Sequence, residues 1–173
     1  MKSLCSFFAL TALFLSTLPA SGAKFSYPTE EKPWFTVEIP ATWKPALSDD
    51  ESLEASSPEE DAYLRFWVLR GKKEIPGLEK DIGGLLKDMV KSPKLISDKP
   101  TKKSVNGIEF TTFAGTGKDT EDGKPLGFEI FLFSPQSGKL GIFYCQYAAD
   151  APKSVIANMI KIVESIQVAK ASK

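Results

Sequence analysis

The alternation of apolar and polar residues predicts several β-strands in this chain of 173 residues. From Phe35 to Ile39 every second residue is apolar, with Thr36 and Glu38 between them, and Pro40 follows. A period of two puts the apolar side chains on one face of a strand, and a proline suits the end of that strand. From this pattern, or from longer apolar runs, strands are also expected at residues 53–56, 62–69, 108–114, 128–133 and 140–147.

Turn sequences indicate that the later strands are joined as antiparallel hairpins. Asn106-Gly107 separates a polar, lysine-rich segment at 95–105 from the strand that begins at Ile108. Both turn residues tolerate the positive φ angles that a two-residue hairpin requires. A second turn is expected at residues 121–124, where Asp and Gly occur together. The segment 95–105 is therefore expected to be an exposed edge strand.

A change of period predicts one helix before these hairpins and one after them. Between residues 77 and 91 apolar positions recur three or four residues apart, and Ser92-Pro93 is expected to end the helix. A wider apolar stripe with the same spacing extends from Val155 to Ile166. Asp150 is expected to be the N-cap of this second helix, with Pro152 in its first turn.

The strands expected at 128–133 and 140–147 are apolar on both faces. Strands of this kind lie in a sheet that is covered on both sides. The hairpins make the sheet mainly antiparallel, and we expect the two helices to cover its two faces. The sequence therefore predicts an α+β fold, a three-layer α/β/α sandwich around a mainly antiparallel sheet. Residues 24–173 are expected to form it as a single domain.

Residues 1–23 have the pattern of a secretory signal peptide. Lys2 supplies a positive charge, and the run from Leu4 to Leu18 is apolar and uncharged. Small residues at Ser21 and Ala23 fit cleavage after Ala23. The apolar run of about 15 residues is shorter than the roughly 20 that span a bilayer. We therefore expect a periplasmic or secreted protein without an integral membrane span once the signal has been cleaved.

Charge and composition exclude several classes of function. The full chain has 22 basic and 22 acidic residues, and loss of the signal peptide, which contains Lys2, leaves a net charge of −1. A near-neutral surface lacks the basic footprint of a nucleic-acid-binding protein. The chain contains no histidine, which excludes Ser-His-Asp and Cys-His catalytic sites and the usual imidazole-based zinc and copper sites.

The remaining candidates for chemistry are one thiol and several carboxylates. Cys145 is the only cysteine outside the signal peptide, and its apolar strand predicts a buried, unreactive thiol, with a nucleophile or an intermolecular disulfide as the alternatives. Asp119–Gly123 offers the oxygen ligands of a calcium loop, but Ile130 stands where such a loop needs a bidentate carboxylate. The acidic clusters at 49–51 and 59–61 are expected to face solvent, with partner recognition or weak cation binding as the alternative.

These observations identify no catalytic, cofactor-binding or metal-binding residue, and they imply no cofactor. The residues that bind a partner stay unknown at this level. Among the aromatic residues, Trp43 follows the turn at Pro40 and is expected to close one end of the core. Trp34 and Trp67 are candidates for an exposed binding patch.

Two stretches carry a family resemblance. One is Phe35–Pro45, in which a strand ends in proline and Trp43 follows, and the other is Ser137–Gln146 with the later helix end at Ile162–Val168. Both resemble the PsbP-like family, whose fold also occurs in bacterial exported proteins of the DcrB type. The hairpin at Val105–Phe110 falls where that family has a similar turn. The resemblance covers most of the mature chain and implies a PsbP-like domain.

The resemblance also implies an accessory or binding role. Plant members of the family help to assemble or stabilise the oxygen-evolving side of photosystem II. Here the N-terminal arm at 24–33 is very short and a secretory signal replaces a transit peptide, which argues against a photosystem role.

We therefore expect an exported, non-enzymatic accessory protein that binds another protein or an envelope component. The alternative is a small-ligand binder with a pocket between sheet and helix, which the doubly apolar strands and Gly83-Gly84 suggest. An enzyme that uses carboxylates or Cys145 is the third hypothesis. The sequence does not indicate the partner's identity or the oligomeric state.

Overall fold

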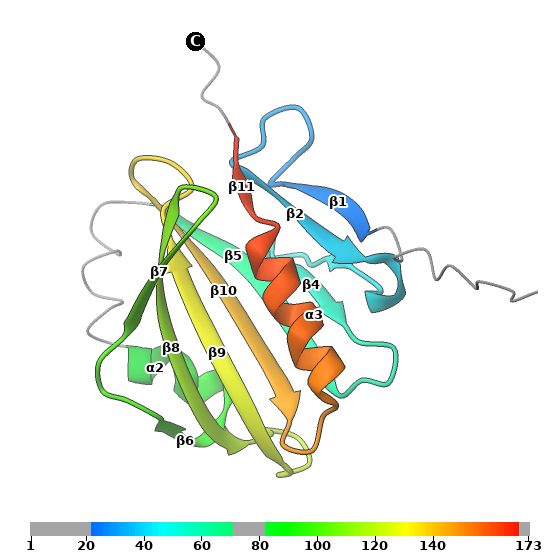
Figure 1. Cartoon of the computed structure of the whole chain (residues 1–173), viewed down its shortest axis with the longest axis vertical. Coiled ribbons are helices and arrows are strands. Elements are labelled where there is room, and N and C mark those ends of the chain that lie inside the picture. The colour runs from blue at the N-terminus through cyan, green and yellow to red at the C-terminus, as the bar shows by residue number, and fades with distance from the viewer. Residues whose placement is uncertain (1–21, 71–81, 170–173) are drawn as a thin grey trace, which may run out of the picture.

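The computed structural model describes residues 22–70 and 82–169, and an eight-stranded sheet forms the centre of this part (Figure 1). The strand order is β3-β4-β5-β10-β9-β8-β6, and β7 pairs with β8 on the same edge as β6. All of these pairings are antiparallel, as the sequence predicts. The strands are β3 (Ala46–Leu47), β4 (Leu53–Ser56), β5 (Ala62–Arg70), β6 (Lys91–Leu95), β7 (Thr101–Val105), β8 (Ile108–Lys118), β9 (Pro125–Phe133) and β10 (Lys139–Ala148).

A smaller sheet and two α-helices complete the described part. The small sheet has the order β1-β2-β11, and the short 3-10 helix η1 follows β2. These elements are β1 (Gly22–Tyr27), β2 (Phe35–Pro40), η1 (Ala41–Trp43), α2 (Ile82–Met89), α3 (Lys153–Glu164) and β11 (Gln167–Val168). The small sheet and α3 contribute to one apolar cluster, whereas α2 contributes to another. The fold is therefore α+β with a mainly antiparallel sheet.

The central strand β10 is buried on both of its faces. Phe143 and Cys145 belong to the cluster that contains α3 and the small sheet, while Ile142 and Tyr144 belong to the cluster that contains α2. Successive side chains of a strand point to opposite faces, so this strand supplies both cores. The ring of Phe143 is fully buried and stacks on Phe66 with 4.1 Å between centroids. The prediction that residues 140–147 are covered on both sides is confirmed.

The neighbouring strand β9 follows the same rule with one difference. Ile130 and Leu132 are buried in the α2 cluster and Phe133 is buried in the α3 cluster, whereas Phe131 is only partly buried. Phe131 still stacks on Phe143, with 5.5 Å between ring centroids. The partial exposure of Phe131 shows that α3 covers less of β9 than of β10.

Both predicted helices exist, but their ends differ from the prediction. The first helix is α2, which ends at Met89, and residues 77–81 of its expected range of 77–91 lie outside the described residues. Ser92-Pro93 does not end the helix; it lies within β6, because Lys91 and the residues from Lys94 onward pair with β8. Asp150 is not the N-cap of α3. Pro152 occupies that position and makes no side-chain capping hydrogen bond.

Two strands of the small sheet were not expected from the sequence. In β1, residues 22–27 pair in register with β2, from Gly22 opposite Pro40 to Tyr27 opposite Phe35. At the other end of the chain, Gln167 and Val168 of β11 pair with Thr36 and Phe35. Both strands are short, and their sequences lack a strong alternating pattern. The long-range pairing with β2 therefore determines their conformation.

The hairpin between β7 and β8 is confirmed. Asn106 and Gly107 both have positive φ, 51° and 77°, as a two-residue turn of this kind requires. The edge-strand prediction for 95–105 is confirmed for β7, whose first four residues are exposed. Trp43 is 2% exposed and packs in the α3 cluster, so its predicted role as a core residue is also confirmed.

Candidate functional site

A groove of about 280 Å³ opens between α3 and the edge of the large sheet. In Figure 1, β8 and β9 lie beside α3 with no described helix in front of them. We call this hollow the α3 groove. Its lining residues are Thr101, Lys103 and Val105 of β7, Phe110, Thr112 and Ala114 of β8, Glu129 and Phe131 of β9, and Ile160, Val163 and Glu164 of α3.

The α3 groove is mainly apolar. Phe110 is buried in the floor, and Phe131 and Val163 contribute further apolar surface. On the helix side, Ile160 is 43% exposed, which makes it one of few large apolar side chains on the described surface. Scattered exposed apolar residues are ordinary, but an apolar side chain at the rim of an apolar hollow is typical of a binding surface.

Glu129 is the charged residue of the groove lining that forms no ion pair with another lining residue. It lies in β9 opposite Ala114 of β8 and Cys145 of β10, two small residues that leave room around its carboxylate. The side chain is half-buried, and no described residue forms a hydrogen bond or ion pair with its carboxylate. Burial raises the pKa of the Glu129 carboxyl above its ordinary value.

One end of the α3 groove is held by contacts between the β7–β8 hairpin and α3. Lys103 forms an ion pair with Glu164, with 2.9 Å between Nζ and Oε1. Asn106 donates from Nδ2 to the backbone oxygens of Glu164 and Ile166, at 2.7 and 3.1 Å. The floor and the wall of the groove are therefore joined at this end, and Lys103 is paired with Glu164 and not with Glu129.

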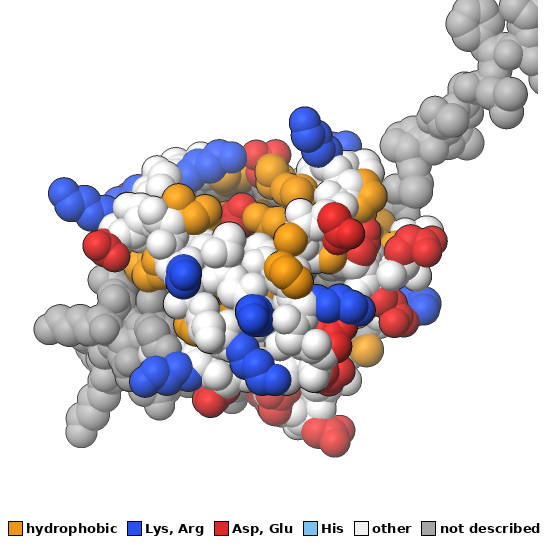
Figure 2. All heavy atoms as spheres, turned by 90° about the horizontal axis from the view of Figure 1, so that it is seen from below, with side chains coloured by type: hydrophobic (Ala, Val, Ile, Leu, Met, Phe, Trp, Pro, Cys, Tyr) orange, Lys and Arg blue, Asp and Glu red, His pale blue; other side chains and the backbone are white. Residues whose placement is uncertain are grey.

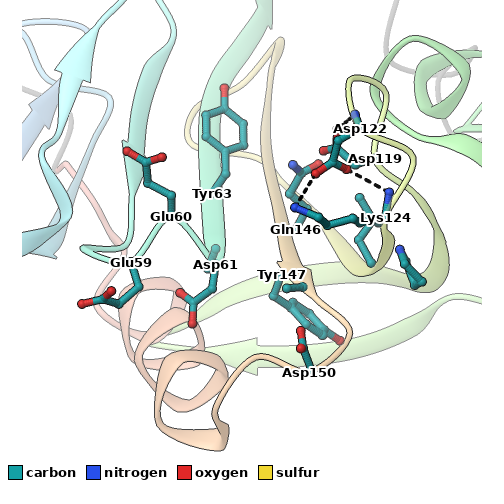
Figure 3. Close-up of a pocket in the computed structure, with 14 residues that line it drawn as sticks. Glu59, Glu60, Asp61, Tyr63, Asp119, Asp122, Lys124, Gln146, Tyr147 and Asp150 are labelled. Carbon is teal, nitrogen blue, oxygen red and sulfur yellow. Dashed lines mark hydrogen bonds and ion pairs between the residues drawn. The ribbon is translucent and has the colours of Figure 1, made fainter.

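A second hollow of about 400 Å³ lies at the loop end of the sheet (Figure 3). Its carboxylates come from the β4–β5 loop, the β8–β9 hairpin and Asp150. Glu59 and Glu60 point away from Asp119 and Asp122 on the opposite side of the pocket (Figure 3). Within residues 22–70 and 82–169, no three acidic or cysteine side chains come together in a metal-binding arrangement.

Two carboxylates of this loop-end pocket, Asp119 and Asp122, stabilise their own loop. Asp119 accepts the backbone N–H groups of Glu121 and Asp122, at 2.7 and 3.2 Å. Lys124 donates to Asp122 across 2.7 Å, and hydrogen bonds from Lys124 lower the pKa of the Asp122 carboxyl. Figure 2 shows basic and acidic side chains together on this end of the molecule, so no single sign of charge dominates it. The predicted turn at 121–124 is present.

The acidic cluster at 49–51 takes part in a structural network. Asp50 is ion-paired with Arg65, and Arg65 Nε lies 3.3 Å from the Glu54 carboxylate. Ser52, a buried residue, donates from Oγ to Asp50 across 2.7 Å. Hydrogen bonds from Ser52 are the main reason that the pKa of Asp50 is lowered. This cluster holds the loop before β4 against β5.

Cys145 is 2% exposed, and its thiol donates to the backbone oxygen of Glu129 across 3.6 Å. Burial raises the pKa of this thiol well above its ordinary value. A thiol in this state is a poor nucleophile, because the thiolate is the reactive form. The predicted burial of this thiol is confirmed, and its lack of reactivity stays a prediction.

Trp34 and Trp67 are both partly buried and do not lie in one patch. Trp34 packs against the α3 cluster and lies under Lys139, whose Nζ is 4.2 Å from the ring centroid. Trp67 packs against the α2 cluster, with the Arg65 guanidinium 5.5 Å from its ring. These two rings therefore belong to opposite faces of the structure.

The sequence interpretation did not identify the α3 groove or Glu129. A signal was present, because Glu129 is the one charged residue in the apolar run from Phe128 to Phe133. The groove itself depends on how far α3 lies from the sheet edge, and no local pattern reports that distance.

No family model matches the chain, and no curated protein matches it. Several solved structures do match. Cyanobacterial PsbP (CyanoP) from Synechocystis sp. PCC 6803 has a TM-score of 0.62 at 14% identity, covering 89% of this chain and 96% of that one. LpqN, described as involved in cell envelope biogenesis of Mycobacterium tuberculosis, has a TM-score of 0.57 at 12% identity, covering 86% of each chain.

Two further structures extend the comparison. The Ran-binding protein Mog1p of Saccharomyces cerevisiae has a TM-score of 0.55 at 9% identity, covering 87% of this chain and 96% of that one. A protein of Bacteroides thetaiotaomicron has a TM-score of 0.59 at 13% identity, and this chain spans 50% of its length. At these identities the likeness concerns the fold alone, which is PsbP-like. None of the helices in the described ranges is long and apolar enough to cross a membrane.

Proposed function

We propose that this chain is an exported, non-enzymatic accessory protein that binds another protein or an envelope component through the α3 groove. One observation carries the proposal: an open, apolar groove has an exposed Ile160 at its rim and a half-buried carboxylate, Glu129, without a partner on its floor. Both features cost free energy in the free chain, and both are relieved when another molecule covers the groove.

The size and shape of the groove favour a macromolecular partner. Small-molecule sites usually occupy about 300–1,000 Å³ and enclose most of the ligand. The α3 groove, at about 280 Å³, lies just below that range and is open on one side. A hollow of this kind suits one or two anchoring side chains of a larger partner.

The comparisons support a binding role without identifying the partner. Mog1p is named as a Ran-binding protein and LpqN as a protein of cell envelope biogenesis. Proteins of this fold are thus described with different roles, and function must be sought in the site. The second candidate function is a small-ligand binder with a pocket between sheet and helix, and the position of the groove between α3 and the large sheet supports it.

Export follows from the signal-peptide pattern at residues 1–23, and periplasmic or secreted members of the DcrB type are the proposed relatives. Cleavage after Ala23 would leave Lys24–Tyr27 to form β1, and these four residues all pair with β2. The predicted mature N-terminus is Lys24, and Edman or mass analysis of the exported chain checks it. Recovery of an uncleaved chain in the cytoplasm would contradict export.

We also interpret the architecture as three layers, in which α2 is one outer layer and α3 with the small sheet is the other. The two apolar clusters on opposite faces of β10 support this interpretation. The outer layer formed by α3 is incomplete over β8 and β9, which is why the groove exists.

Affinity capture from the native envelope tests the proposed function. The bait is the full chain, and Ile160→Glu is compared with Leu47→Glu, which makes the same change at a side chain 62% exposed on β3. In the large sheet β3 is at the opposite edge from β6 and β7, far from the groove in strand order. We expect Ile160→Glu to lose a partner that the wild type and Leu47→Glu retain. Equal recovery with all three baits would contradict the proposal.

A further inference from the structure

We propose that Glu129 receives a basic side chain of a protein partner, an arginine or lysine with apolar neighbours that cover Ile160 and Phe131. This inference rests on the proposed function and names the chemistry of the segment that enters the α3 groove. It follows from the charge complementarity between one isolated carboxylate and a basic side chain. The apolar surface around that carboxylate fits the apolar neighbours of the basic side chain.

The carboxylate of Glu129 has no opposite charge of its own. Of the other charged groups that line the α3 groove, Lys103 and Glu164 are paired with each other. On the neighbouring strands, Cys145 and Tyr147 add no positive charge. A half-buried carboxylate loses hydration that nothing in this chain replaces, and an incoming cation restores that lost stabilisation.

The surroundings of Glu129 fit the whole of a basic side chain. Arginine and lysine have long aliphatic stems that pack on apolar surface while the charged head reaches a polar group. Here the apolar surface comes from Phe110, Phe131 and Ile160, and aromatic rings also attract cations. Arginine fits best, because its planar guanidinium can bond both oxygens of one carboxylate.

The exposed Ile160 argues that the basic side chain belongs to a larger molecule. A free amine bound at Glu129 would leave the rim apolar surface in water. A protein segment can place apolar residues on either side of the arginine and cover that surface as well. Anchors at protein interfaces are commonly arginine or aromatic side chains in hollows surrounded by less important contacts.

The test uses two blocked tripeptides, acetyl-Leu-Arg-Leu-amide and its counterpart with citrulline, which has the shape of arginine without the charge. Each is titrated into the purified, ¹⁵N-labelled chain, and shifts of the Phe131 and Ile160 amides are followed. We expect the arginine peptide to bind about tenfold more tightly than the citrulline peptide, the gain of a charge-assisted hydrogen bond after screening. Binding is expected in the millimolar range, so titration continues to about 10 mM.

Two variants assign that preference to Glu129. Glu129→Gln should abolish it, while Glu109→Gln, which removes the same charge from an exposed side chain on the same sheet, should keep it. Equal affinity for the two peptides, no shift with either peptide, or a preference that survives in Glu129→Gln would each overturn the inference. Thermal unfolding of each variant establishes that the binding results come from folded protein.

Envelope capture separates this inference from the proposed function. A partner that is lost with Ile160→Glu but kept with Glu129→Gln would leave the proposed function standing and overturn the basic side chain. A partner that is kept with both variants would overturn both proposals. A concentration-dependent dimer that Ile160→Glu abolishes would show that a second copy of the chain fills the groove, and would also overturn the inference.

Discussion

Alanine substitutions at two consecutive residues, Ile142→Ala and Phe143→Ala, should both strongly destabilise the protein. Each side chain is 0% exposed, yet the two lie in different apolar clusters on opposite faces of β10. Truncation of a buried phenylalanine costs about 3–5 kcal/mol, and truncation of a buried isoleucine about 2–5 kcal/mol. Phe143 should lie toward the upper end, because its ring stacks on both Phe66 and Phe131.

Urea unfolding, followed by tryptophan fluorescence, measures these losses of unfolding free energy, and thermal unfolding measures the corresponding fall in melting temperature. For a domain of this size each kcal/mol lowers the melting temperature by roughly 2–4 °C, so Phe143→Ala should lower it by about 6–20 °C. Leu47→Ala is the control, because a side chain 62% exposed should change stability by less than about 0.5 kcal/mol. A sheet with one solvated face would make only one of the two neighbours costly. If either variant lies within about 1 kcal/mol of wild type, the two-sided burial of β10 is refuted.

Three further predictions concern the groove and its surroundings. In urea unfolding, Glu129→Gln should stabilise the free chain at pH 7 but not at pH 4. Burial raises the pKa of the Glu129 carboxyl in the folded chain above the ordinary value of 4.5. The charged carboxylate therefore destabilises the folded chain above the folded pKa, and this penalty disappears as the pH falls toward and below 4.5. A constant difference at both pH values would contradict burial as the cause. Asn106→Gly should lower the free energy of unfolding by about 1–3 kcal/mol, because glycine accepts the positive φ but cannot donate to the backbone oxygens of Glu164 and Ile166. Asn106→Ala should lower it further, because alanine lacks the donor and also disfavours the positive φ. A smaller loss for Asn106→Ala than for Asn106→Gly would contradict this assignment. Cys145 should react with a thiol reagent only after unfolding, and rapid labelling of the native chain would show that the thiol is accessible.

Local sequence patterns predicted most of the large sheet. The alternating or doubly apolar runs that form β4, β5, β8, β9 and β10 are visible in the sequence, and the Asn106-Gly107 turn predicts the hairpin between β7 and β8. The elements that were missed depend on partners distant in sequence. β1 and β11 form because both pair with β2, and β6 forms around Pro93 because β8 offers an edge.

The candidate site was beyond local patterns for a similar reason. Glu129 is visible in the sequence as a charge in an apolar run, but its isolation depends on Ala114 and Cys145 beside it and on the absence of a paired cation among the described residues. The acidic clusters were more conspicuous, yet Asp50, Asp119 and Asp122 mainly stabilise their own loops. The most conspicuous acidic residues of the sequence therefore lie outside the α3 groove, which we propose as the functional site.

The most direct test of the account is site-specific photo-crosslinking in living cells. A photoreactive amino acid replaces Ile160 at the rim of the α3 groove, and in a matched strain it replaces Leu47 on β3. We predict one discrete crosslinked species from position 160 and none of that mass from position 47, with loss of the species when Glu129→Gln is added. Identical crosslinking patterns from the two positions, or no crosslink from position 160, would contradict the conclusion that the α3 groove binds a partner.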